Sequence, residues 1–147
     1  MSFISPANKT LMLSRNLYQN KKVLVTGGAT GIGLSLAQSY AELGATVMIC
    51  SRNEERLKSA CETHPNINYR VLDVRNLDGV KQYAEEMYNQ GLLPDVVVNN
   101  AAGNFVCPTE KLSQNAWNSV IDIVLKGTFA MTHEIGKRLI LLRKPGV

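Results

Sequence analysis

The sequence predicts an α/β protein built on a doubly wound parallel sheet, of which about four strands are present. Two observations predict this class. Short apolar segments alternate with amphipathic segments along most of the 147 residues, and a glycine-rich turn at 27–33 joins the first pair of them. Strands that alternate with helices form βαβ units, whose strands run parallel and whose crossovers are right-handed.

The elements can be placed in order from their local signals. Apolar residues at helical spacing predict a first helix from Ile32 to Leu43, which Gly44 ends. Two shorter helices are expected at 54–61 and 80–88. Short apolar runs predict four strands, at 22–26, 46–50, 68–74 and 95–99.

The two ends of the chain are expected to differ. Residues 1–20 show no clean periodicity, so we expect an N-terminal arm over 1–21 and one incomplete domain over 22–147. Ser113 can cap a long last helix, and Gly127 in the middle of that helix indicates close packing. Because the chain stops at Val147, where a fifth strand should begin, we expect a fragment or truncated product whose fourth strand is an open edge.

The composition argues against several classes of function. The 16 basic residues are scattered rather than clustered with aromatic side chains, so we expect no nucleic-acid partner. The apolar runs are far shorter than the roughly 20 residues that a membrane-spanning helix needs. Cys50, Cys61 and Cys107 lack the spacing of metal ligands, so we expect reduced thiols and no metal site.

The glycine-rich turn predicts a dinucleotide-binding site of the Rossmann type. Gly27, Gly31 and Gly33 have the spacing GxxxGxG between a strand and a helix, so main-chain N–H groups and a helix N-terminus can face a diphosphate. A tight turn without a ligand is the alternative, and the position of the turn argues against it. The phosphate loop of nucleotide triphosphatases is excluded, because its lysine position is Leu34 here.

The end of the second strand favours NADP(H) over NAD(H). An acid at this point would hold the ribose hydroxyls, but the sequence reads CSRN at 50–53. Arg52 can pair with a 2′-phosphate and Ser51 can donate to it, although Arg52 can also be an ordinary surface residue. Asp73 is placed to accept a hydrogen bond from the adenine amino group, or to act as a cap.

Two motifs at the right separation resemble those of short-chain dehydrogenases/reductases: TGGATGIG at 26–33 and VNNAAG at 98–103. Further segments, with an FISP-like start at Phe3–Pro6, narrow the resemblance to the mitochondrial type of 2,4-dienoyl-CoA reductase: NNAAGNF (99–105), PTEKLSQNAW (108–117), DIVLKGTF (122–129) and EIGKRLI (134–140). The resemblance implies NADPH-dependent reduction of a 2,4-dienoyl-CoA to a 3-enoyl-CoA in β-oxidation of unsaturated fatty acids. It also implies a mitochondrial location, with peroxisomal or cytoplasmic alternatives, and a homo-oligomer, a tetramer in the family, for the full-length protein.

The resemblance assigns a role to each site residue. The residues that would hold the pyrophosphate and the adenosine end of NADPH are Gly27, Gly28, Ala29, Thr30, Gly31, Ile32, Ser51, Arg52 and Asp73. Asn104, the catalytic candidate, would donate to the thioester oxygen, and Phe105 would lie against the acyl chain. Arg75 and Ser113 would contact the CoA portion, since a guanidinium suits its phosphates. Asn104 as a turn former, Phe105 as a core aromatic and Ser113 as a simple cap are the alternatives.

The resemblance also shows what this chain lacks. In the family, a catalytic Tyr and Lys follow the fifth strand, so we expect no reductase activity from the 147-residue chain alone. The YxxxK match at Tyr18–Lys22 precedes the first strand and is rejected, and Lys126 replaces a smaller polar residue of related sequences. The alternatives are an inactive NADP-binding or partner-binding isoform, and another short-chain reductase of the peroxisomal dienoyl-CoA or carbonyl type.

Overall fold

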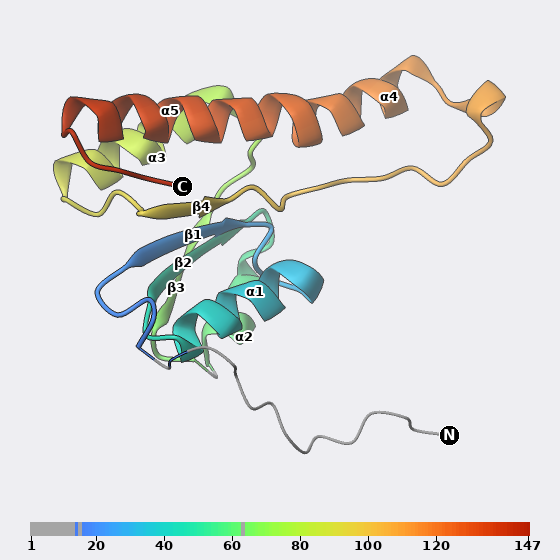
Figure 1. Ribbon diagram of the computed structural model, residues 1–147. Coiled ribbons are helices and arrows are strands. Elements are labelled where there is room, and N and C mark those ends of the chain that lie inside the picture. Colours follow the sequence, from blue (N-terminus) through green and yellow to red (C-terminus); the bar gives the residue numbers. More distant parts are fainter. Residues whose placement is uncertain (1–13, 15, 63) are drawn as a thin grey trace, which may run out of the picture.

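Four parallel strands form the centre of the protein in the computed structural model, which describes residues 14, 16–62 and 64–147 (Figure 1). The first strand lies between the second and the fourth. It pairs with the second with Lys22 opposite Thr46, and with the fourth with Val23 opposite Val96. This parallel α/β sheet confirms the predicted fold class. The strand order is β3-β2-β1-β4, with β1 at Lys22–Thr26, β2 at Thr46–Ser51, β3 at Ile67–Val71 and β4 at Val96–Val98.

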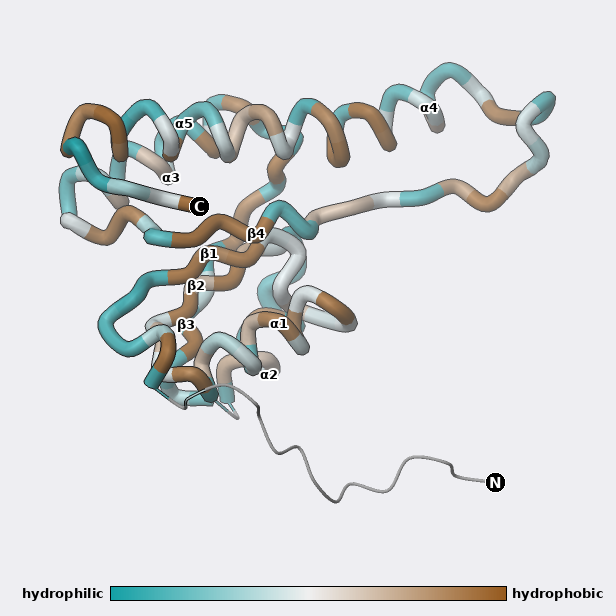
Figure 2. The backbone as a smooth tube through the Cα atoms, in the orientation of Figure 1, coloured by the Kyte–Doolittle hydropathy of each residue, from teal (hydrophilic) through white to brown (hydrophobic). Residues whose placement is uncertain are grey.

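Helices cover both faces of the sheet and divide the core in two (Figure 1). On one face, α1 (Gly31–Glu42) and α2 (Glu54–Glu62) pack against alternate residues of the strands. On the other face lie α3 (Leu77–Asn89) and α5 (Thr128–Leu141). Figure 2 shows the strands as largely hydrophobic segments, as expected for a sheet that is buried on both faces.

Several predicted boundaries are wrong by a few residues. The third strand ends at Val71 rather than at 74, because the chain turns there and the Asn76 N–H donates to the Asp73 carbonyl at 2.9 Å. The following helix starts at Leu77 rather than at 80, because the Asn76 side chain caps it by accepting from the Gly79 N–H at 3.0 Å. The fourth strand covers only Val96–Val98.

The predicted long last helix begins after Ser113 as expected, but it contains a π-helical segment that was not predicted. A short 3₁₀ turn at Thr109–Lys111 precedes α4 (Gln114–Ile121), which passes through a π-helical segment, η2 (Asp122–Gly127), into α5. Gly127 lies where the predicted close packing occurs: a Cβ there would be 2.7 Å from Cγ2 of Val74.

The expected open edge of β4 is partly paired. Val97 donates to the Val147 carbonyl at 2.7 Å, and Val147 donates to the Asp95 carbonyl at 2.9 Å. These two hydrogen bonds, one on either side of Val96, have the pattern of a parallel pair of strands. Val147 therefore pairs with part of the outer edge of β4 in parallel fashion.

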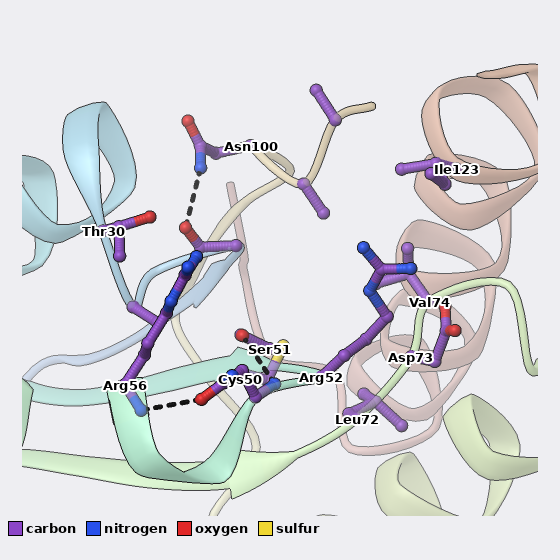
Figure 3. Close-up of a pocket in the computed structure, with 15 residues that line it drawn as sticks. Thr30, Cys50, Ser51, Arg52, Arg56, Leu72, Asp73, Val74, Asn100 and Ile123 are labelled. Atoms are coloured by element: carbon purple, nitrogen blue, oxygen red, sulfur yellow. Dashed lines mark hydrogen bonds between the residues drawn. The ribbon is translucent and has the colours of Figure 1, made fainter. Parts of the chain in front are cut away.

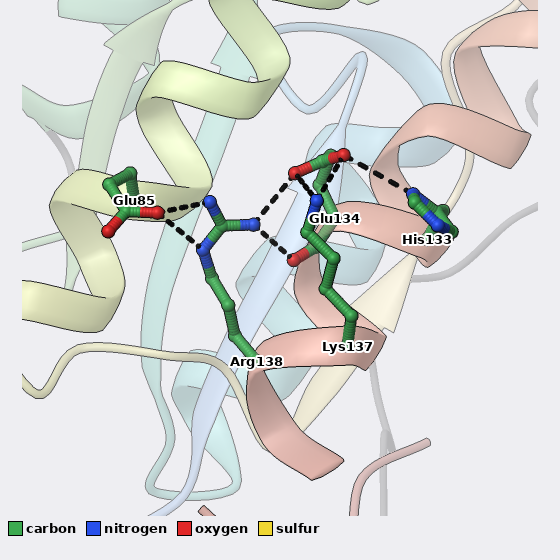
Figure 4. Close-up of polar contacts among 5 residues, drawn as sticks. All are labelled: Glu85, His133, Glu134, Lys137 and Arg138. Atoms are coloured by element: carbon green, nitrogen blue, oxygen red, sulfur yellow. Dashed lines mark hydrogen bonds and ion pairs between the residues drawn. The ribbon is translucent and has the colours of Figure 1, made fainter. Parts of the chain in front are cut away.

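A buried arginine joins the two helices on the second face (Figure 4). Arg138 of α5 is 4% exposed. It donates to Glu85 of α3, and to the carboxylate and the carbonyl of Glu134 at 2.7 and 2.8 Å. Lys137 and His133 also contact the Glu134 carboxylate, at 2.7 and 3.2 Å. We call these five residues the Arg138 cluster.

The predictions for the N-terminus lie largely outside the described residues. Phe3–Pro6 and most of the expected arm are among these undescribed residues. Tyr18, the tyrosine of the rejected YxxxK match, packs edge-on against Tyr40 with ring centroids 4.9 Å apart. In the described part of the chain, every helix is too short or too polar to span a bilayer.

Candidate functional site

A pocket of about 700 Å³ lies at the carboxyl ends of the strands, where the loops after β1, β2, β3 and β4 meet (Figure 3). Parallel α/β sheets bind ligands at this edge. Six of the predicted cofactor residues line the pocket: Gly27, Ala29, Thr30, Ser51, Arg52 and Asp73.

The glycine turn after β1 forms one wall of the pocket. Gly27 and Gly31 have φ values of +65° and +56°, which side chains rarely tolerate. Gly33 packs under the turn, since a Cβ there would lie less than 3.0 Å from the Gly27 carbonyl oxygen. Within the described residues, the Thr30 side chain accepts no capping hydrogen bond, and the first turn of α1 contains no acid. The N-terminus of α1 therefore fits the diphosphate of a dinucleotide.

A set of hydrogen bonds fixes the glycine turn to the end of β4. The Thr26 hydroxyl oxygen accepts from the N–H groups of Asn100 at 3.0 Å and Ala101 at 2.9 Å. The Asn100 side-chain amide donates to the carbonyls of Thr26 at 3.0 Å and Gly27 at 3.3 Å. Neither Thr26 nor Asn100 was predicted as a site residue, although both lie within the two sequence motifs quoted above.

We expect Thr26→Val to destabilise the protein by about 2 kcal/mol, because valine has the same shape but leaves two N–H groups without an acceptor. Thr26 is 1% exposed, so water cannot replace the lost partner without a rearrangement. Thr26→Ser keeps the hydroxyl and should lose less stability. Chemical unfolding followed by circular dichroism measures both, and equal losses for the two variants would contradict this role of the hydroxyl.

Two arginines give the pocket its positive charge. Figure 3 shows Arg52 extending toward the Asp73 side, whereas Arg56 extends toward Thr30. Arg56, which lies in the first turn of α2, was not predicted from the sequence. The sequence feature that could have predicted Arg56 is its position four residues after Arg52, which places both side chains at the same edge of the sheet.

Asp73 is already paired. Its carboxylate receives the Arg75 guanidinium, with Nη2 to Oδ2 at 2.6 Å. The pKa of Asp73 is lowered mainly by the hydrogen bond from the Arg75 side chain. The positive charge of Arg52 lowers this pKa further. Arg75 faces Asp73 and is not among the residues that line the pocket.

The structure does not bring the remaining predicted residues into this pocket. Gly28 is buried behind the turn, and Ile32 is 76% exposed. Asn104 and Phe105 are exposed on the long segment between β4 and α4, which extends away from the sheet (Figure 1). Ser113 caps α4 by accepting from the Ala116 N–H at 3.2 Å, which is the alternative stated for it.

Among the described residues, the three cysteines form no disulfide bond. Cys50 lines the pocket but is buried, and this burial raises the pKa of its thiol to about 12. Its thiol is therefore protonated at neutral pH and suits packing rather than nucleophilic chemistry.

The fold and the position of the pocket are typical of dinucleotide-binding proteins, and comparison with known proteins makes the class more specific. Residues 21–147 match the family described as short chain dehydrogenase. The chain belongs to this family of oxidoreductases, which use nicotinamide cofactors.

Named relatives agree with the family. The chain is 42% identical over 141 residues to a probable (3E)-enoyl-CoA-producing 2,4-dienoyl-CoA reductase of Caenorhabditis elegans, covering 92% of this chain and 46% of the relative. It is 37% identical over 133 residues to a probable (2E)-enoyl-CoA-producing 2,4-dienoyl-CoA reductase of Bacillus subtilis, covering 88% and 52%. The chain thus spans about half the length of the curated relatives it matches.

A solved structure agrees as well. The crystal structure of a short chain dehydrogenase from Bacillus anthracis superposes with a TM-score of 0.81 at 42% identity. The match covers 86% of this chain and 54% of the other.

Proposed function

We propose that this chain contributes the NADPH-binding part of a 2,4-dienoyl-CoA reductase that produces a 3-enoyl-CoA in the β-oxidation of unsaturated fatty acids. The observation that carries the cofactor choice is the pair Ser51 and Arg52 on the pocket wall, with no acid at the end of β2. The names of the relatives support the substrate class.

When bound, NADPH supplies a hydride to the far end of the conjugated diene. The residues of this chain bind and orient the two substrates. The amide groups of the turn from Gly27 to Ile32 would face the pyrophosphate, Arg52 and Ser51 the 2′-phosphate, and Asp73 the adenine amino group. The roles proposed on the substrate side are those of Asn104 toward the thioester oxygen, Phe105 along the acyl chain, and Arg75 and Ser113 toward CoA.

A mitochondrial location and a homo-oligomer of the full-length protein belong to the same proposal. Relatives also include peroxisomal 2,4-dienoyl-CoA reductases, such as one from Danio rerio at 33% identity over 125 residues, so the peroxisome is the alternative. A second candidate function is a partner-binding chain without activity. Three large apolar side chains that stand exposed along α4, η2 and α5 favour it: Trp117, Leu125 and Phe129.

We expect Arg52→Ala to weaken NADPH binding by about 30-fold, the size of one lost charge-assisted hydrogen bond, and to change NADH binding little. Isothermal titration calorimetry of the purified chain with NADPH and with NADH measures this selectivity. Lys58→Ala is the matched control, because it removes one positive charge from α2 at a residue that does not line the pocket. Equal losses for NADPH and NADH would remove the 2′-phosphate assignment.

A further inference from the structure

The Asp73 carboxylate is the only acid among the described residues that line the pocket, and Arg75 occupies it. The Arg75 N–H donates to Oδ1 at 3.0 Å. Its Nε is 3.0 Å from both oxygens, and its Nη2 is 2.6 Å from Oδ2. An ionised carboxylate has about four acceptor positions. Three N–H groups of Arg75 therefore occupy most of the hydrogen-bonding capacity of Asp73.

A ligand that donates to Asp73 therefore competes with Arg75 for the carboxylate. The adenine amino group of a dinucleotide is such a donor, and in the proposed function Asp73 is its acceptor. The pair is easily opened, because the side chains of Arg75 and Asp73 are 39% and 28% exposed, and exposed ion pairs are weak. The free guanidinium of Arg75 is then available to an anionic group beside the pocket.

We infer that the Asp73–Arg75 pair couples the two substrates, so that each increases the affinity for the other. A phosphate of coenzyme A draws Arg75 away from Asp73, and Asp73 then accepts the hydrogen bond of the adenine amino group. Binding linkage is reciprocal, so NADPH equally releases Arg75 for coenzyme A. This inference rests on the proposed function, because that function supplies the roles of both residues.

A simple electrostatic role of Arg75 makes the opposite prediction. NADPH is a polyanion, so removing a nearby positive charge should weaken its binding. If Arg75 instead competes for Asp73, removing it frees the acceptor and strengthens NADPH binding. The sign of the change therefore separates the two roles.

The experiment is a calorimetric titration of the full chain with NADPH, with and without coenzyme A. We expect Arg75→Ala and Arg75→Gln to bind NADPH about threefold more tightly, as the release of one exposed ion pair allows. Coenzyme A should strengthen NADPH binding to the wild type by a similar factor and leave Arg75→Ala unchanged. In an Asp73→Asn background, Arg75→Ala should bring no gain.

Lys81→Ala is the matched control, since it removes an exposed positive charge from α3 outside the pocket and should not strengthen NADPH binding. Weaker or unchanged NADPH binding by both Arg75 variants overturns the inference, as does a wild type that coenzyme A does not affect. If either of these overturning results is found while Arg52→Ala shows its expected loss of NADPH selectivity, the coupling is refuted but the proposed function is not. If the wild type does not bind NADPH, the proposed function and the coupling both fail.

Discussion

We expect Gly33→Ala to lose about 3 kcal/mol of its free energy of unfolding, together with its dinucleotide binding. A Cβ at this position would lie 2.5 Å from the Asn100 amide nitrogen and less than 3.0 Å from the Gly27 carbonyl oxygen. The Gly27 carbonyl is main chain, so relief of the clash requires the turn itself to move. The same shift breaks the Asn100 contacts and displaces the amide groups of the proposed diphosphate site.

Two other glycines provide controls for this variant. Gly31 has φ +56°, and an added Cβ there would meet no described heavy atom within 4 Å, so Gly31→Ala tests backbone strain alone, at about 1 kcal/mol. Gly136 lies within α5, where an added Cβ likewise meets no described atom within 4 Å, so Gly136→Ala should stabilise the protein by up to about 1 kcal/mol. Urea unfolding measures all three variants. A Gly33→Ala protein as stable as Gly31→Ala would contradict the packing argument.

The fold and the position of the pocket were predictable because their signals are local. The glycine turn, the strand before it and the helix after it occupy one continuous stretch, and β1 has the predicted bounds. Arg52 follows β2 directly, and the carboxyl ends of parallel strands share one edge, so its place on the pocket wall followed from the strand assignment. In each case a short pattern determines the backbone, and the backbone determines the position of the side chain.

The contacts that connect distant segments were not predictable in this way. Thr26 and Asn100 are 74 residues apart, and Arg138 and Glu85 are 53 apart. A single sequence carries no periodicity that pairs such residues. The π-helical segment was not predicted either, and Gly127 at its end packs against Val74, which lies 53 residues earlier in the chain. An arginine on an apolar helix face was the one available signal for the Arg138 cluster.

The second large effect is expected at Arg138. Its guanidinium is almost fully buried between α3 and α5, where its bonds to Glu85 and Glu134 offset the cost of removing the charge from water. Arg138→Ala removes this charge, leaves the buried side of Glu134 without its partner, and opens a cavity between the helices. We expect a loss of about 3 kcal/mol, the lower end of the range for one partner of a buried pair, because Glu85 is half exposed.

Two variants separate the contributions to this loss. Arg138→Met keeps most of the packing volume but not the charge, so it should lose less stability than Arg138→Ala. Lys137→Ala removes an exposed partner of the same Glu134 carboxylate and should cost about 1 kcal/mol or less. Thermal and urea unfolding give the three values. An Arg138→Ala loss no larger than that of Lys137→Ala would show that the buried pair does not hold α5 to α3.

The pH dependence of stability provides an independent measurement on the same cluster. The hydrogen bond from Lys137, followed by those from Arg138 and His133, lowers the pKa of the Glu134 carboxyl from 4.5 to about 2. A carboxyl whose pKa is lower in the folded state stabilises the fold above its unfolded pKa, and this stabilisation disappears as the pH falls through the folded pKa. The wild type should therefore lose about 1–2 kcal/mol through this group between pH 4.5 and pH 2, after allowance for solvent screening. Arg138→Ala retains only Lys137 and His133 as partners, so its loss over the same interval should be smaller, and identical acid profiles for the two proteins would contradict the role of Arg138 in that pKa.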